Sequence, residues 1–150
     1  MEYTEEFDKL KTKVLKYIMY KKRTEREVRQ KFTDIEQDIL EDIIENLKEL
    51  EYIDDNKYAY KAVNEFMRLN NMSIKELKYK LISKGLNEYL VQDYMEKHRE
   101  KLEEYELQSA KNIISKKCPT SMDKVDKQEI IQYLIKKGYK KEIIKGAINE

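Results

Sequence analysis

The chain has 150 residues, of which 31 are Lys or Arg and 30 are Asp or Glu, so its formal net charge is only +1. Apolar residues make up 40 %, enough for a modest core, while three Gly and one Pro supply too few turns for a β-sandwich or barrel. No apolar stretch reaches the roughly 18 residues that a membrane helix needs, and a single cysteine excludes a disulfide framework. We therefore expect an all-α, cytoplasmic protein.

The reactive side chains argue against catalysis. The single histidine, His98, and the single cysteine, Cys118, lie far apart in the chain, and no zinc, nucleophile-elbow or phosphate-loop motif is present. Asp54 and Asp55 form an acidic pair without further oxygen ligands at EF-hand spacing, so we interpret this pair as a turn and a helix N-cap. We expect neither an enzyme nor a cofactor or metal site, and the sequence indicates no role for His98 or Cys118.

The first expected helices lie within residues 14–47. Val14, Leu15 and Ile18 have the spacing that places apolar side chains on one face of a helix. Thr24 followed by Glu27 has the pattern of a capping box, in which each side chain bonds to the backbone N–H of the other residue. This pair predicts that a second helix starts at Thr24, and apolar residues at helical spacing within 35–47 predict a third.

The same helix-start signal returns twice. Ser73 is followed by Glu76, and Asp126 is followed by Glu129 in a looser version of the box. Positions 24, 73 and 126 are 49 and 53 residues apart, and an apolar stripe precedes each of them. The chain therefore reads as three units of about 50 residues, each with the same order of helices.

The second and third units also share a helix-end signal. Residues 81–86 align with residues 134–139 without a gap, and each segment contains a Lys-Gly pair followed by an apolar residue. We expect Gly85 and Gly138 to adopt the left-handed conformation that ends a helix. Another amphipathic helix is predicted after each glycine, while the first unit lacks the glycine and must turn differently.

These signals predict three tandem three-helix repeats, comprising residues 1–55 with an N-terminal extension, 56–106 and 107–150. Three short amphipathic helices bury little apolar surface alone, so we expect neighbouring repeats to stack into an elongated, curved rod. A single compact helical bundle is the alternative architecture. We expect the protein to be a monomer.

Four local matches, in order along the chain, give a resemblance to the RecX family of bacterial regulators of the RecA recombinase. They are residues 20–28 around the first capping box, residues 47–59, residues 74–86 and the segment ending at Tyr139. Together they cover nearly the whole chain, from about residue 14 to residue 148. The sequence departs from the family pattern at Glu51, where the family usually has glycine, at Thr24 in place of serine, and in the connector 68–72.

The resemblance implies a non-enzymatic regulator that lodges in the groove of a RecA filament on single-stranded DNA. It further implies a role in DNA repair, in recombination and in the SOS response, through inhibition of strand exchange and ATP turnover. The residues alone leave two other functions open. One is a sequence-independent helical DNA-binding protein, and the other is a helical-repeat adaptor for a different protein partner.

Charge is distributed unevenly along the chain. Residues 1–55 hold 11 basic and 16 acidic side chains, residues 56–106 hold 10 and 9, and residues 107–150 hold 10 and 5. The net charge therefore runs from −5 through +1 to +5. Such a gradient favours a partner of mixed charge, such as a protein–DNA filament, over free DNA.

Basic side chains are the candidate contacts to a RecA filament or to DNA. Arg23, Arg26 and Arg29 recur every third residue, which aligns their guanidinium groups on one side of a helix, where they can bind carboxylates or phosphates. The alternative is that they pair with acids of the same unit, such as Glu25 and Glu36. The lysine-rich end near Tyr133 and Tyr139 could be a solvated helix end, a protein contact or a weak, direct DNA contact. The full set of candidates is Arg23, Arg26, Arg29, Lys75, Lys78, Lys84, Lys136, Lys137, Lys140 and Lys141.

Overall fold

The computed structural model describes residues 4–118 and 124–149, and it is all-helical, as the sequence predicts. The described helices are α1 (Glu5–Tyr20), α2 (Glu25–Lys31), α3 (Gln37–Glu49), α4 (Asp55–Leu69), α5 (Ile74–Ser83), α6 (Glu88–Lys97), α7 (Arg99–Lys117), α8 (Lys124–Lys137) and α9 (Lys141–Ile148). None of the described helices is both long enough and apolar enough to cross a bilayer.

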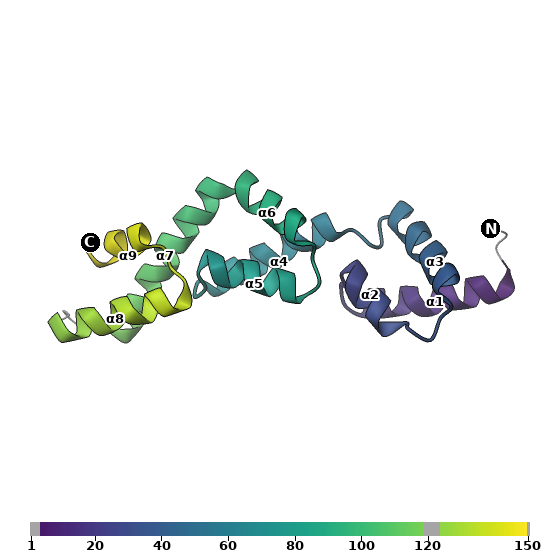
Figure 1. Ribbon diagram of the computed structural model, residues 1–150, viewed down its shortest axis with the longest axis horizontal. Coiled ribbons are helices and arrows are strands. Elements are labelled where there is room, and N and C mark those ends of the chain that lie inside the picture. Colours follow the sequence, from purple (N-terminus) through teal and green to yellow (C-terminus); the bar gives the residue numbers. More distant parts are fainter. Residues whose placement is uncertain (1–3, 119–123, 150) are drawn as a thin grey trace.

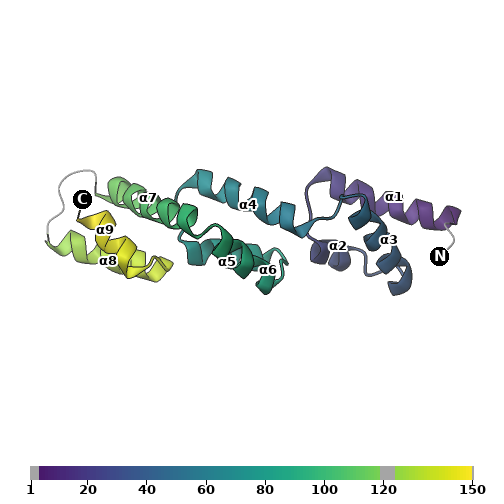
Figure 2. The ribbon, with the colours of Figure 1, turned by 90° about the horizontal axis from the view of Figure 1, so that it is seen from above.

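The helices are arranged along one long axis, with α1 to α3 at one end, α4 to α6 in the middle and α7 to α9 at the other end (Figures 1 and 2). The accessible surface is 10407 Å². A compact monomer of this mass, 18.3 kDa, exposes about 8,100 Å². The excess surface is the cost of the extended shape, in which no single core gathers all the helices.

Three separate apolar clusters hold the rod together. The first lies between Phe7 and Ile53, the second between Ala59 and Tyr105, and the third between Ala110 and Ala147. Each cluster draws mainly on three consecutive helices. From here on we call α1–α3, α4–α6 and α7–α9 the first, second and third units, so that Asp55 and residues 99–106 belong to a later unit than the predicted boundaries give them. The long helix α7 runs across the predicted boundary at residue 106, and it contributes to both the second and the third cluster.

The predicted helix starts at Thr24 and Ser73 are confirmed as capping boxes. The Thr24 hydroxyl accepts a hydrogen bond from the Glu27 N–H at 3.1 Å, and the Glu27 carboxylate accepts one from the Thr24 N–H at 2.9 Å. Ser73 and Glu76 repeat this geometry. The third prediction is wrong in its position, because α8 begins at Lys124 and Asp126 lies in its first turn instead of at its N-cap.

The predicted helix ends are also confirmed. Gly85 and Gly138 have φ angles of +100° and +96°, and each follows a helix directly. In the first unit the corresponding second helix, α2, ends at Phe32 with a φ of −107°, so it turns without a left-handed residue. A left-handed residue follows the third helix, α3, where the φ of Glu51 is +65°. A side chain in this left-handed region costs about 1 kcal/mol, which explains why glycine suits this position better than glutamate.

Candidate functional site

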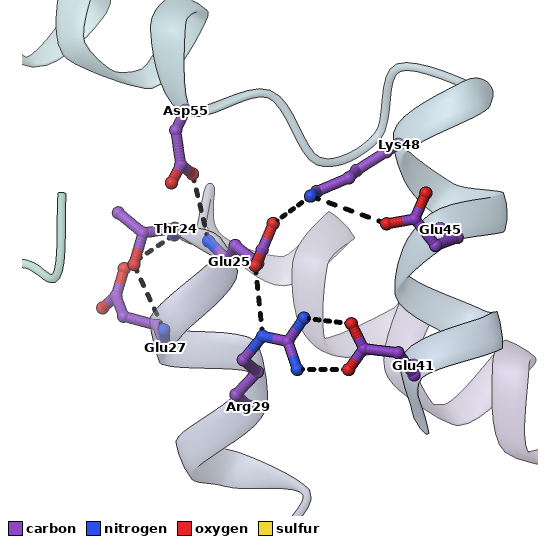
Figure 3. A network of polar contacts seen from close by, with 8 residues as sticks. All are labelled: Thr24, Glu25, Glu27, Arg29, Glu41, Glu45, Lys48 and Asp55. Carbon is purple, nitrogen blue, oxygen red and sulfur yellow. Dashed lines mark hydrogen bonds and ion pairs between the residues drawn. The ribbon is translucent and has the colours of Figure 1, made fainter. Parts of the chain in front are cut away.

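The arginines of the first unit do not form one free face. Arg29 makes a two-pronged contact with Glu41 of α3, with N–O distances of 2.7 and 2.8 Å, and its Nε donates to Glu25 at 3.1 Å. Figure 3 shows this network, in which Lys48 of α3 also pairs with Glu25. Internal pairing therefore occupies the guanidinium of Arg29, with Glu41 taking the place of the expected Glu36.

This network shifts the titration of its members. The hydrogen bonds that Arg29 donates to Glu41 raise the pKa of Arg29 and lower the pKa of Glu41. Burial raises the pKa of Glu25, but hydrogen bonds from Lys48 and Arg29 outweigh it and leave the pKa lowered. The two carboxylates are thus ionised partners of fixed cations, and the network ties α2 to α3.

The other two arginines lie in different surroundings. Arg23 precedes α2, so it does not share a helix face with Arg26 and Arg29, and its guanidinium lies 4.1 Å from the centre of the Tyr17 ring. Its Nε is buried, and no atom of residues 4–118 or 124–149 accepts a hydrogen bond from it. The exposed Arg26 runs beside Gly85, where an added Cβ would lie 2.8 Å from the Cβ of Arg26.

The candidate lysines of the middle unit are dispersed. Lys75 is exposed and runs beside Gly138, just as Arg26 runs beside Gly85. Lys78 donates to the side-chain oxygen of Gln92 at 2.9 Å and does not line the pocket that Lys75 lines. Lys84 ends α5, and its backbone carbonyl accepts a hydrogen bond from the Thr24 hydroxyl at 2.8 Å.

The candidate lysines of the last unit divide between paired and free side chains. Lys137 pairs with Glu76 at 3.3 Å, and Lys140 lies 3.7 Å from Glu103. Lys136 and Lys141 are exposed, and no ion pair to either occurs among the described residues. The free pair therefore offers charge to a partner without first breaking an internal contact.

A groove of about 540 Å³ between α5 and α8 brings several of these residues together. Its basic lining comes from Lys75, Lys80, Lys136 and Lys137, and two aromatic rings, Tyr79 and Tyr133, face the same space. Tyr79 is 74 % exposed, whereas Tyr133 is 39 % exposed and has the Lys117 ammonium group 4.1 Å from the centre of its ring. Ammonium groups beside exposed rings can bind phosphates and stack on bases or planar side chains.

Lys80 and Tyr79 were missed by the sequence analysis. Both belong to α5, and they become neighbours of the lysine-rich end only because the last turn of α8 meets the first turn of α5 across a repeat boundary, at the Ser73–Lys137 and Glu76–Lys137 contacts. Helical spacing within α5 could have placed Tyr79 with Lys75, four residues apart. No sequence signal placed this helix beside α8.

Each capping residue also joins two repeats, which the sequence did not reveal. Thr24 donates its hydroxyl proton to the carbonyl of Lys84 at 2.8 Å, and Ser73 does the same to Lys137 at 2.7 Å. We call the Thr24–Lys84 contact and its surroundings the first joint, and the Ser73–Lys137 contact and its surroundings the second joint. Gly85 and Gly138 lack a Cβ at these contacts, so the helices can meet closely.

A carboxylate from the following unit completes each joint. At the first joint, Asp55 of α4 accepts a hydrogen bond from the Glu25 N–H at 3.0 Å. At the second joint, the fully buried Glu106 of α7 accepts from Ile74 N–H and from Lys140 N–H, both at 3.0 Å. These acids satisfy part-buried backbone donors at helix starts, which have no partner within their own helix.

Other reactive side chains do not form a catalytic arrangement within the described ranges. No group of three or more His, Cys, Asp or Glu residues there is placed to hold a metal ion. His98 stacks on Tyr94 at a ring distance of 4.3 Å, and Cys118 follows the last turn of α7. Neither His98 nor Cys118 is among the residues that line the α5–α8 groove.

Comparison with curated proteins shows similarity to bacterial regulatory proteins. No family model matches the sequence. The chain is 31 % identical to the Regulatory protein RecX of Staphylococcus epidermidis over 157 aligned positions, covering all of this chain and 58 % of that protein. It is 32 % identical to the RecX of Staphylococcus carnosus, covering 89 % of this chain and 51 % of the relative. The chain thus spans about half the length of the curated relatives it matches.

Solved structures share the fold. The crystal structure of RecX from Lactobacillus salivarius superposes with a TM-score of 0.82 at 24 % identity, covering 95 % of this chain and 94 % of that one. A second crystal structure of a regulatory protein RecX gives a TM-score of 0.79 at 21 % identity, covering all of this chain and 81 % of the other. At these identities the likeness shows the fold alone, but the curated relatives carry the same name, and the chain belongs to the RecX family.

Proposed function

We propose that this chain is a non-enzymatic regulator that binds the RecA filament on single-stranded DNA and inhibits its strand-exchange and ATPase activities. The observation that carries the proposal is the similarity to proteins named Regulatory protein RecX along all of this chain. The relatives are about twice as long as the aligned region, so the part of the activity that resides in this chain is itself part of the proposal.

The shape of the molecule supports a large, extended partner. The rod presents its helices in a row, with charge that changes from −5 in residues 1–55 to +5 in residues 107–150. A filament that combines acidic DNA with a protein surface of mixed charge can meet both ends of such a gradient. In this arrangement the α5–α8 groove and the exposed Lys136 and Lys141 face the more acidic side of the partner.

Direct binding to DNA is the second candidate function. The observation that favours it is the groove with four lysines and the exposed rings of Tyr79 and Tyr133. Such a site needs no recombinase to bind a strand, and its affinity must fall steeply with salt because bound strands release counterions. The two functions therefore predict different behaviour on free DNA.

One titration separates these functions. Labelled oligothymidylate is titrated with the chain, alone and after coating with RecA and a non-hydrolysed ATP analogue, while its fluorescence anisotropy is followed. A filament regulator binds the coated strand at least tenfold more tightly than the free strand, and it lowers RecA's DNA-dependent ATP hydrolysis. Equal binding to both forms, with a steep salt dependence, contradicts the proposal and favours the DNA-binding function.

A pair of variants tests the lysine-rich end within the same assay. Lys136→Gln with Lys141→Gln removes two exposed charges without breaking an internal ion pair, so folding stays intact. The matched control, Lys9→Gln with Lys13→Gln, removes the same charge from an exposed face of α1. We expect weaker binding to the filament for the first pair only. Equal loss in both variants shows that net charge, and not this end of the rod, sets the affinity.

A further inference from the structure

The first joint carries a groove of its own, at the place equivalent to the α5–α8 groove. Lys22 and Asn71 each stand two residues before a capping residue, and Lys84 and Lys137 each stand directly before the glycine that ends a helix. The first groove has a volume of about 470 Å³. Its lining residues are Lys21, Lys22, Tyr58, Lys61, Ala62, Glu65, Phe66 and Lys84.

The two grooves differ in how their charge is balanced. At the second joint, Glu76 neutralises Lys137 at 3.3 Å. At the first joint, Lys84 and Glu27 occupy the corresponding positions, yet they form no ion pair in the part of the chain that the structure describes. Glu65 is the one carboxylate that lines the first groove, against four lysines, and no described acid lies within ion-pairing distance of them. The first groove therefore holds an excess of positive charge.

Two of these lysines meet across the joint. Lys22 follows α1 in the first unit, and Lys61 lies on α4 in the second. The neighbouring ammonium group of Lys61 lowers the pKa of Lys22, with burial as the second cause. Two neighbouring ammonium groups repel one another unless an anion lies between them.

The chemistry of the lining favours phosphate over carboxylate. Four lysines from two units line this groove, and among the described residues no arginine lines it to make the planar two-pronged contact that carboxylates favour. Lysine binds phosphate as a compact point charge, and several lysines can share the oxygens of one tetrahedral group. The half-buried Tyr58 adds a hydroxyl donor at the same wall.

We propose that the first groove binds a phosphate group and that the bound phosphate holds the first unit against the second. Lys21 and Lys22 come from one side of the joint, while Lys61 and Lys84 come from the other, so a shared anion replaces their repulsion by attraction. The phosphate can belong to a nucleic-acid strand or to a free nucleotide, because both present the same oxygens. This inference concerns the chain alone, and its test contains no recombinase.

Calorimetric titration with pyrophosphate in phosphate-free buffer tests the site. We expect the wild-type chain to bind pyrophosphate, and Lys22→Gln with Lys61→Gln to bind it at least tenfold more weakly. Removing a like-charge contact does not impair folding, which circular dichroism checks. The control, Lys9→Gln with Lys13→Gln, carries the same charge change on α1 and should bind as the wild type does. Absence of binding to the wild type, or equal weakening in the control, overturns the proposal.

Spin labels test the clamping of the joint. Asp38→Cys on α3 and Glu96→Cys on α6, in a Cys118→Ser background, place exposed labels on the first and second units. Saturating pyrophosphate should narrow the distribution of distances between the two labels. When Lys22→Gln and Lys61→Gln are added to the labelled protein, pyrophosphate should no longer narrow this distribution. An unchanged distribution at saturation overturns the clamping.

Competition identifies the source of the phosphate. Oligothymidylate that displaces pyrophosphate assigns the groove to a strand backbone, whereas ATP that displaces it without such competition assigns the groove to a free nucleotide. Either result supports the phosphate site. Displacement by neither compound overturns the assignment of the groove to these ligands.

Discussion

The two joints of the rod use the same helix cap but differ in what surrounds it. At each joint a capping hydroxyl donates to the last carbonyl of the next unit's second helix, beside a glycine. The first joint adds one carboxylate bond, from Asp55, whereas the second adds the two bonds of the buried Glu106. The comparison teaches that a repeated motif fixes how units meet, while the residues around it decide how firmly they are held.

The helix that follows each joint explains the difference. Helix α7 packs Leu102 and Tyr105 into the second cluster and Ala110 and Ile113 into the third, so it belongs to both units. Helix α4 places its buried residues in the second cluster, and the first cluster ends before it, at Ile53. The second joint is thus braced by a helix that packs into two clusters, whereas no helix packs into both the first and the second cluster among the described residues.

Polar contacts from α7 brace the connector between α4 and α5 as well. The Ser109 hydroxyl donates to the Met72 carbonyl at 3.1 Å, and Tyr139 lies 2.6 Å from the same hydroxyl. Because Ser109 has one proton to donate, Tyr139 must be the donor in that second bond. Burial raises the pKa of Tyr139, which keeps its hydroxyl protonated. The connector that departs from the family pattern is therefore fixed by side chains of the following unit.

The largest expected effect comes from removing the carboxylates at the joints. Glu106→Ala removes a fully buried carboxylate and leaves the two part-buried N–H groups of Ile74 and Lys140 without their acceptor, and we expect it to lower the free energy of unfolding by on the order of 3 kcal/mol. Asp55→Ala removes one such bond, and burial already raises the pKa of Asp55, so we expect a loss of about 1 kcal/mol. Urea denaturation followed by circular dichroism measures both. If both variants lose the same free energy of unfolding, the second joint is not held more firmly than the first.

The glycines of the joints give the next effect. Gly85→Ala and Gly138→Ala each place a side chain at positive φ, and the new Cβ meets Arg26 or Lys75 at 3.0 Å or less. We expect each substitution to lower the free energy of unfolding by about 1–3 kcal/mol.

Gly146→Ala is the matched control for these substitutions. Gly146 lies inside α9, where an added Cβ meets Leu107 at 3.4 Å, an ordinary contact. We expect this change to stabilise the chain by about 0.5–1 kcal/mol, because alanine is the better helix former. Thermal and urea denaturation of the three variants measure these effects. If Gly146→Ala destabilises the chain as much as Gly85→Ala and Gly138→Ala do, the positive φ and close contacts at the joints are not the cause of the loss.

The capping hydroxyls should show similar effects at both joints. Ser73→Ala and Thr24→Val each remove an acceptor for the helix start and a donor to the next unit, and we expect each to lower the free energy of unfolding by about 1–2 kcal/mol. Asp126→Ala serves as the comparison, because Asp126 lies within the first turn of α8 and does not cap it. A loss at Ser73 that matches only an isolated cap, about 0.5 kcal/mol, would show that the contact across the joint is energetically neutral.

The sequence predicted local features well and contacts between units poorly. The boxes at Thr24 and Ser73 and the positive φ of Gly85 and Gly138 follow from rules that act within a few residues, and they were confirmed. Glu106 carried no such signal, because its hydrogen-bond partners lie more than thirty residues away in the chain.

The candidate binding residues show the same division. The periodic spacing of the arginines could not reveal that Glu41, on the next helix, holds Arg29. Tyr79 and Lys80 join the groove at α8 only through the stacking of two units. Sequence periodicity therefore located the basic residues, and tertiary packing decided which of them remain free.

The smallest expected effect concerns Arg29 and acid. Its guanidinium lowers the pKa of Glu41, and together with Lys48 it lowers the pKa of Glu25. Acids with a lowered pKa stabilise the fold above their unfolded pKa, and this contribution is lost as the pH falls through their folded pKa. Asp55 acts in the opposite sense, since its raised pKa favours the fold as the pH falls.

We therefore expect Arg29→Gln to lower the free energy of unfolding by about 0.5 kcal/mol at pH 7, because the Arg29 side chain is 34 % exposed, and to lower it by less at pH 3. Urea denaturation at both pH values tests this, with Lys13→Gln as a control for loss of one exposed charge. A cost for Arg29→Gln that stays constant between pH 7 and pH 3 would mean that its contacts with the two glutamates do not contribute to stability, and that Arg29 is as available to a partner as Arg26.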